Sequence, residues 1–135
     1  MKNSTLTAMV LLAGLPTLAA ADCSPSTRVT GNNLTNLITG NTVCATRGSD
    51  VWQEQHRAGG QLWDYKMGPG HPIDPSKQVG TWSISRNLVT YCYTGGICYS
   101  YSVHGSGTGP YSFCYANGTE VVSGATFKPG NASCP

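Results

Sequence analysis

The stretch VGTWSISRNLVTYCYTGGICYSYSV, residues 79–103, decides the fold. It contains three runs in which apolar and polar residues alternate, separated by short turns at 86–87 and 94–96. Alternation with a period of two predicts β-strands that have one buried face. Folded as an antiparallel meander, the runs place their large apolar side chains on one face and their Ser, Thr and Cys residues on the other.

The two turns fix the register of this meander. The first turn sets Trp82 opposite Tyr91 on the inner face. The second sets Tyr91 opposite Tyr99 on that face, and Cys92 opposite Cys98 on the outer one. Both hairpins agree on which face is inside, and a shift by one residue would break that agreement.

Outside the meander, the same patterns predict a small all-β domain with a short N-terminal helix. Apolar residues at 34, 37 and 38 have the spacing of one helix face, Asn32 or Asn33 can cap its start, and Gly40 suits its end. A proline-rich loop is expected at 68–78. Strands are predicted at 41–46, 51–57, 61–67, 79–86, 88–93, 97–103, 110–116 and 119–127.

Sequential antiparallel strands in a chain of this size favour an up-and-down barrel of about eight strands, because closure leaves no exposed edge. A two-sheet β-sandwich would show the same alternation and is the alternative. In either fold, the turn at Asn117-Gly118 sets Phe113 opposite Val122 and Tyr115 opposite Glu120.

Residues 1–21 have the features of a secretory signal peptide. Lys2 provides the positive start, residues 6–18 the apolar run, and three alanines at 19–21 the cleavage signal. The run is too short for a membrane span. We therefore expect a mature single domain, residues 22–135, that has no membrane span and is exported to the periplasm or the extracellular space.

The six cysteines all lie in the predicted mature chain. An even number in a small exported protein indicates disulfides. Zinc is not expected, because closely spaced pairs such as C-x-x-C are absent from the sequence. The predicted disulfides are Cys92–Cys98, which face each other in the meander, Cys23–Cys134, which lie near the two termini, and Cys44–Cys114, which remain.

Charge excludes one class of partner. Without Lys2, the mature chain has seven basic and six acidic residues, and no basic run that could neutralise phosphates. Nucleic acid is therefore not expected as a partner.

The hairpin at 50–67 contains the candidate chemistry. A turn at Gly59-Gly60 would turn both its tryptophans, Glu54 and His56 inwards, and would leave a polar face with Gln53 and Gln55 in water. A one-residue shift would bring Glu54 opposite Asp64, and facing carboxylates are unfavourable. The predicted inner pairs are Trp52 with Met67, Glu54 with Tyr65, and His56 with Trp63.

A buried carboxylate and imidazole cost several kcal/mol (roughly) unless they are paired. Tyr65 is the expected donor to Glu54. One hypothesis is that Glu54 and His56 are the polar groups of an aromatic ligand pocket. The alternative is a structural Glu–Tyr–His network whose members hydrogen-bond only to one another and bind no ligand. The candidate ligand-binding residues are Trp52, Glu54, His56, Trp63, Tyr65, Tyr91 and Tyr99.

The positions of the tyrosines also bear on whether the barrel interior is filled or holds a ligand. All seven fall on the predicted inner face, at positions 65, 91, 93, 99, 101, 111 and 115. They either fill a narrow barrel or line a wet cavity, because buried phenols need hydrogen-bond partners. Sugar-like or planar aromatic ligands would suit such a lining.

Short motifs resemble those of small exported bacterial proteins without assigned activity, whose barrels are lipocalin-like (calycin). They are Gly40 to Cys44, the hairpin from Trp52 to Tyr65, Gly80-Thr81-Trp82, and the tyrosine-rich strands that end at 111–114. Gly80-Thr81-Trp82 is similar to the lipocalin G-x-W. The resemblance implies a barrel in the cell envelope and implies no substrate.

Two functions remain. The first is a module that binds a small aromatic or polyhydroxy ligand. The second is a protein-interaction module, such as an inhibitor of a secreted hydrolase or a surface component, acting through loop 68–78 and the outer face. Catalysis is least favoured, because no nucleophile with a base is recognisable. No cofactor is expected, nor a metal, since His71 and His104 have no ligand spacing with Glu54 and His56.

Overall fold

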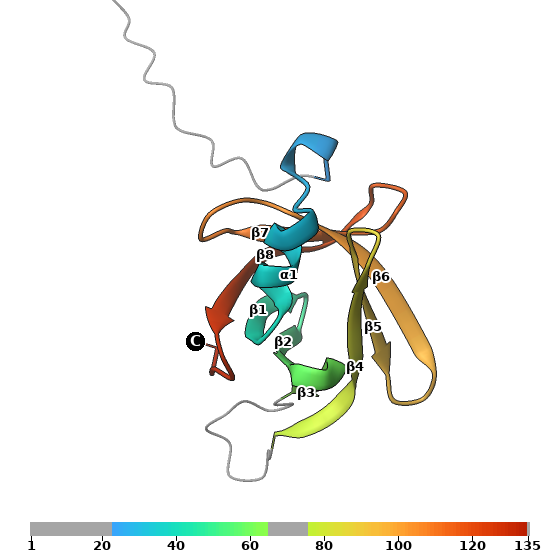
Figure 1. Ribbon diagram of the computed structural model, residues 1–135, viewed down its shortest axis with the longest axis vertical. Coiled ribbons are helices and arrows are strands. Elements are labelled where there is room, and N and C mark those ends of the chain that lie inside the picture. The colour runs from blue at the N-terminus through green and yellow to red at the C-terminus, as the bar shows by residue number, and fades with distance from the viewer. Residues whose placement is uncertain (1–22, 65–75, 135) are drawn as a thin grey trace, which may run out of the picture.

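The computed structural model describes residues 23–64 and 76–134, which form a closed barrel of eight antiparallel strands (Figure 1). Each strand pairs with its neighbours in the sequence and β8 pairs with β1, so the fold is the predicted up-and-down barrel. The strands are β1 (Asn41–Arg47), β2 (Asp50–Arg57), β3 (Gln61–Asp64), β4 (Lys77–Ser85), β5 (Leu88–Tyr93), β6 (Ile97–His104), β7 (Tyr111–Cys114) and β8 (Glu120–Pro129).

Three predicted features lie wholly or partly outside the described residues. They are the signal peptide, the end of the third predicted strand, and the loop 68–78, of which only 76–78 are described. In the described part of the chain, no helix is long and apolar enough to cross a membrane.

A short helix, α1 (Gly31–Ile38), covers one end of the barrel. Figure 1 shows it between β8 and β1 on one side and β4 and β5 on the other. Leu34 and Ile38 are fully buried in the core, as their spacing predicts. We call this end, which includes the turns at 58–60, 86–87 and 105–110, the closed end.

The helix begins slightly earlier than predicted, and Thr30 rather than Asn32 or Asn33 is its N-cap residue. The N–H of Gly31 donates to the side-chain oxygen of Asn87 at 2.8 Å. Because a distant turn satisfies this group, no local Asn cap is needed. Gly40 has a positive φ of 74° and ends the helix as predicted.

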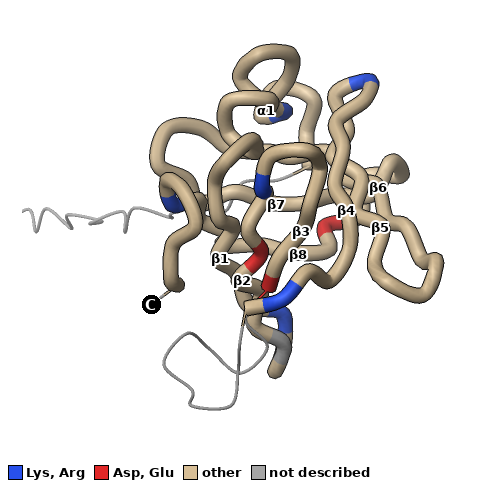
Figure 2. Tube along the Cα trace, turned by 60° about the horizontal axis from the view of Figure 1, so that its bottom comes forward, with Lys and Arg blue, Asp and Glu red and all other residues tan. Residues whose placement is uncertain are grey.

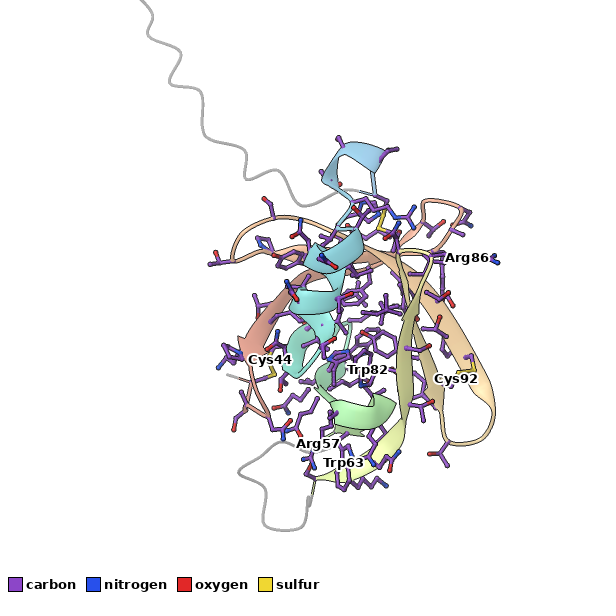
Figure 3. The ribbon with its side chains drawn as sticks, in the orientation of Figure 1. Cys44, Arg57, Trp63, Trp82, Arg86 and Cys92 are labelled. Carbon is purple, nitrogen blue, oxygen red and sulfur yellow. A yellow bond between two sulfur atoms is a disulfide. The ribbon has the colours of Figure 1, made fainter. Side chains whose placement is uncertain are left out.

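The meander has the predicted register. Trp82 pairs with Tyr91, and Tyr91 pairs in turn with Tyr99. Figure 3 shows Trp82 projecting into the barrel and Cys92 on its outside. Gly80 is required here, because a Cβ atom at this position would overlap the carbonyl oxygen of Cys92.

The hairpin of β2 and β3 differs from the prediction by one residue. Its turn is the 3-10 segment η2 (Ala58–Gly60), which sets Gln55 opposite Trp63 and Glu54 opposite Asp64. Leu62 rather than Trp63 therefore enters the core, where it is fully buried. The side chain of Trp63 lies beside Arg57 instead, with the guanidinium 4.1 Å from its ring centre (Figure 3).

The last hairpin is also shifted in part. Phe113 pairs with Val122 as predicted, but Glu120 pairs with Cys114 rather than Tyr115. Register shifts between β7 and β8 cause this difference.

Two of the three disulfides differ from the prediction. Cys92–Cys98 is confirmed, but Cys23 bonds to Cys114 in β7. Cys44 in β1 bonds to Cys134. The predicted pairs Cys23–Cys134 and Cys44–Cys114 are wrong, because the two termini run to different strands and each is joined to the barrel separately.

The C-terminal segment, residues 130–134, covers the outer face of β1 and β2. The Thr42 hydroxyl donates to the carbonyl of Gly130 at 2.6 Å, and the backbone N–H of Cys134 donates to the side-chain oxygen of Gln53 at 3.2 Å. Gln53 is consequently buried rather than in water as predicted. Gln55 is also buried, and its side-chain oxygen accepts from Arg57.

Candidate functional site

The end of the barrel opposite α1, with turns at 48–49, 94–96 and 115–119, holds an open cavity of about 580 Å³ that we call the mouth cavity. Its aromatic lining comes from Trp52, Tyr93, Tyr99, Tyr101 and Tyr115. Its other lining residues are Arg47, Ser49, Val51, Glu54 and Asp64.

Glu54 is the buried ionisable group of this cavity. Its side chain is 6% exposed, and the Tyr93 hydroxyl donates to its Oε1 at 2.7 Å. Its Oε2 is buried and has no hydrogen-bond partner among the described residues. Burial raises the pKa of Glu54 from 4.5 to about 7, Asp64 adds to this rise, and the Tyr93 hydrogen bond opposes it.

Asp64 lies next to Glu54 because of the one-residue shift in the hairpin. The two residues are directly paired across β2 and β3, so both side chains leave the sheet on the same face. The arrangement that charge repulsion disfavours in the sequence is thus present in the structure. Partial protonation of Glu54 near neutral pH reduces the repulsion, because a protonated Glu54 is neutral.

Tyrosine rings form one side of the cavity. The rings of Tyr99 and Tyr101 are nearly parallel, at 9° and 6.4 Å between centroids, and Tyr101 stacks on Tyr115 at 5.4 Å. Tyr99 is 37% exposed, and Val51, which also lines the cavity, is 56% exposed. Exposed apolar residues around a polar centre are typical of a surface that binds something.

His56 lies deeper and belongs to a satisfied structural network. Its Nδ1 is 3.0 Å from the carbonyl of Asn41, which can only accept, so Nδ1 carries the proton. The Tyr91 hydroxyl then donates to Nε2 at 2.9 Å. Burial lowers the pKa of His56 to about 4, so the ring is neutral at physiological pH.

The predicted site residues therefore separate into three groups. Trp52, Glu54 and Tyr99 line the mouth cavity. His56 and Tyr91 are fully buried and bonded to each other, and Trp63 lies on the outer face. Tyr65 lies outside the described residues, and the hydroxyl bound to Glu54 comes from Tyr93.

Sequence reasoning missed some lining residues. Tyr93, Tyr101 and Tyr115 were on the predicted inner face, but the sequence does not show which inner positions lie near an open end. Asp64 was assigned to the outer face by the wrong register. Arg47 is the last residue of β1 and lies just beyond the predicted strand 41–46.

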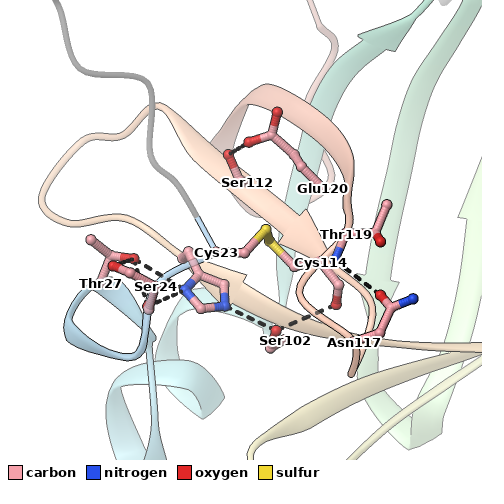
Figure 4. The surroundings of a disulfide bond; sticks show 10 residues. Cys23, Ser24, Thr27, Ser102, Ser112, Cys114, Asn117, Thr119 and Glu120 are labelled. Carbon is pink, nitrogen blue, oxygen red and sulfur yellow. Dashed lines mark hydrogen bonds between the residues drawn. A yellow bond between two sulfur atoms is a disulfide. The ribbon is translucent and has the colours of Figure 1, made fainter.

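A second polar cluster lies under the N-terminal segment, residues 23–30, which includes η1 (Pro25–Thr27), on the outside of the barrel (Figure 4). Nδ1 of His104 donates to the carbonyl of Ser24 at 2.9 Å, and Nε2 accepts from the Ser102 hydroxyl at 2.9 Å. Ser102 is 7% exposed. The cluster fastens this segment to β6, and the Cys23–Cys114 disulfide fastens it to β7.

The other charges of the described residues are dispersed. Figure 2 shows them scattered along the trace without a basic stripe. Within residues 23–64 and 76–134, no group of three His, Cys, Asp or Glu side chains is arranged to hold a metal ion.

Comparison of the chain with models of protein families, with curated proteins and with solved structures found no match.

Proposed function

We propose that this chain is an exported barrel that binds a small aromatic or polyhydroxy ligand in the mouth cavity. One observation carries the proposal. The carboxyl group of Glu54 is buried beside the cavity, and one of its oxygens has no partner in the described part of the chain. Buried polar atoms are normally hydrogen-bonded, and an exception needs a partner from elsewhere.

The shape and lining of the cavity support this function. About 580 Å³ falls within the usual range for small-molecule sites, which combine aromatic surface with a few polar groups. The stacked tyrosines offer flat faces for a ring, and their hydroxyls offer hydrogen bonds. Three disulfides and the predicted signal peptide favour export.

The test is binding of 4-nitrophenyl glycosides, which contain both a planar ring and a polyol, measured by saturation-transfer NMR. We expect binding to the wild type and a clear loss in Tyr99→Ala, which removes a ring of the cavity. Trp63→Ala is the matched control, because it removes a ring from the outer face. Equal loss in both variants, or no binding by the wild type, would contradict the proposal.

Native mass spectrometry of the protein purified from its source provides an independent measurement. A co-purified small molecule supports the proposal. A co-purified protein would favour the alternative, an inhibitor or surface component that acts through other parts of the chain.

A further inference from the structure

We propose that the mouth cavity selects protonated organic amines, with the ammonium group between Glu54 and Asp64 and an apolar or aromatic body against the tyrosine rings. This inference rests on the proposed function and specifies the ligand class of the same site. It uses three independent features of the cavity, which are its acceptor, its charge and its aromatic faces.

The acceptor is the Oε2 atom of Glu54. Tyr93 already occupies Oε1, and Oε2 has no donor in the described part of the chain. An ionised carboxylate is an acceptor only, so the group it requires is a donor. A primary ammonium has three N–H donors and suits this position, whereas a quaternary ammonium has none.

The charge comes from two carboxyl groups paired across neighbouring strands. Asp64 adds to the rise in the pKa of Glu54, so the two carboxyl groups repel each other although Lys77 is paired with Asp64 from β4, and a cation beside Glu54 relieves the repulsion. Neutral polyols offer hydrogen bonds but no such relief. An anion would add a third negative group.

The aromatic faces lie beside the same carboxyl groups. Tyr93 contacts Tyr99 edge to face at 6.3 Å between ring centroids, and Tyr99 continues into the stack with Tyr101. Ring faces attract cations and also pack against apolar groups. The cavity therefore suits a molecule that has a charged head and a flat or aliphatic body.

Binding should depend on pH through Glu54, whose pKa is raised to about 7 by burial. The groups around it are Asp64 on β3, Tyr91 and Tyr93 on β5, and Tyr101 on β6. Arg47 of β1 lies at the rim, and Lys77 of β4 is paired with Asp64. Burial raises the pKa of all three tyrosines, so they stay neutral. As the pH rises through about 7, Glu54 ionises and affinity for a cation increases.

Three probes of similar size and different charge test the proposal by calorimetry. They are 2-phenylethylamine, 2-phenylethanol and phenylacetate. At about pH 8 the amine is still protonated. We expect it to bind about tenfold or more tightly than the alcohol, as is usual for a hydrogen bond to a charged group, with phenylacetate weakest. The preference should shrink at about pH 5.5, where Glu54 is protonated.

Glu54→Gln should reduce the preference for amine over alcohol several-fold, because it keeps the shape and removes one of the two carboxylates, leaving Asp64. Glu120→Gln is the matched control, since it makes the same change on an exposed residue of β8 outside the cavity and should keep the preference. Thermal melts check that both variants are folded. A preference that is as large in Glu54→Gln as in the wild type overturns the proposal.

The remaining outcomes separate this inference from the proposed function. If the alcohol binds as well as the amine, the amine selectivity is wrong and the ligand-binding function stands. If both fail to bind while a 4-nitrophenyl glycoside binds, the conclusion is the same. If none of these probes binds, the proposed function fails as well.

Discussion

Single buried groups set the chemistry of this barrel. Glu54 and His56 lie two positions apart on β2 and both enter the barrel, but they meet different surroundings. His56 has partners on both ring nitrogens, whereas Glu54 has a partner on one oxygen only. Of the two, only Glu54 has capacity left for a ligand.

The first prediction concerns Glu54 and pH. Its pKa is about 7 in the folded chain and 4.5 ordinarily, so the folded chain prefers the protonated form. The resulting stabilisation is complete below pH 4.5 and is lost as the pH rises through about 7. It amounts to about 3 kcal/mol, at 1.36 kcal/mol per pKa unit.

Glu54→Gln lacks this titration. We expect its stability relative to the wild type to rise by about 3 kcal/mol between pH 4.5 and pH 8, as measured by urea unfolding at both pH values. His56 titrates in the opposite sense in the same range, but it is present in both proteins and cancels in the difference. Parallel pH profiles of the two proteins would show that Glu54 ionises normally.

The second prediction separates the structural tyrosine from the cavity tyrosine. Tyr91→Phe removes the donor to Nε2 of His56 and leaves a buried acceptor unsatisfied. We expect a loss of about 1–3 kcal/mol in the free energy of unfolding. Tyr99→Phe changes an exposed ring at the mouth and should stay within about 0.5 kcal/mol. Similar losses in the two variants would contradict this division of roles.

At the scale of elements, the meander of β4, β5 and β6 is the best specified part of the molecule. Its two tight turns and its alternation agree with one register. The β2–β3 hairpin is less well specified, because a two-residue and a three-residue turn both fit Ala58-Gly59-Gly60. Burial of Leu62 decides for the longer turn.

The third prediction tests the face assignment in β4. Trp82 packs edge to face on His56, and its Nε1 donates to the carbonyl of Arg57 at 3.0 Å. Trp82→Ala should cost about 3–5 kcal/mol, as is usual for removing a large core side chain. Ser83→Ala, on the exposed face, should cost less than about 0.5 kcal/mol. Comparable urea midpoints for the two variants would overturn the assignment.

The whole molecule is a closed barrel with both described ends of the chain fastened to its outside. The N-terminal segment is bonded to β7 and the C-terminal segment to β1, across 91 and 90 residues of sequence. Each long disulfide loop restricts the unfolded chain strongly. The core of a small domain with a cavity at one end provides limited stability, and the disulfides add to it.

The fourth prediction compares long and short disulfide loops. Removing Cys44–Cys134 with two alanines should cost about 4–5 kcal/mol, whereas removing Cys92–Cys98, six residues apart, should cost about 2 kcal/mol. Urea unfolding of the two double variants measures the difference. Peptide mapping without reduction checks the pairing itself, and a Cys23–Cys134 peptide would contradict the structure. If the short loop proves the more costly to remove, chain entropy does not set these contributions.

The sequence alone determined the architecture, because alternation, turn residues and length together favour a barrel of about eight strands. It also determined the meander register and Cys92–Cys98, since these depend on residues close together in the chain. It placed Trp52, Glu54 and Tyr99 on the inner face for the same reason.

The remaining features depend on long-range packing. Which strands receive Cys23 and Cys134 depends on where two segments run over the barrel, and no local pattern encodes that path. The pairing of Glu54 with Asp64 follows from the burial of Leu62, which outweighs the repulsion expected between exposed carboxylates because burial leaves Glu54 partly protonated. The place of the mouth cavity depends on the whole fold as well, because its lining comes from five strands and from the turns at 48–49 and 115–119, at the end opposite α1.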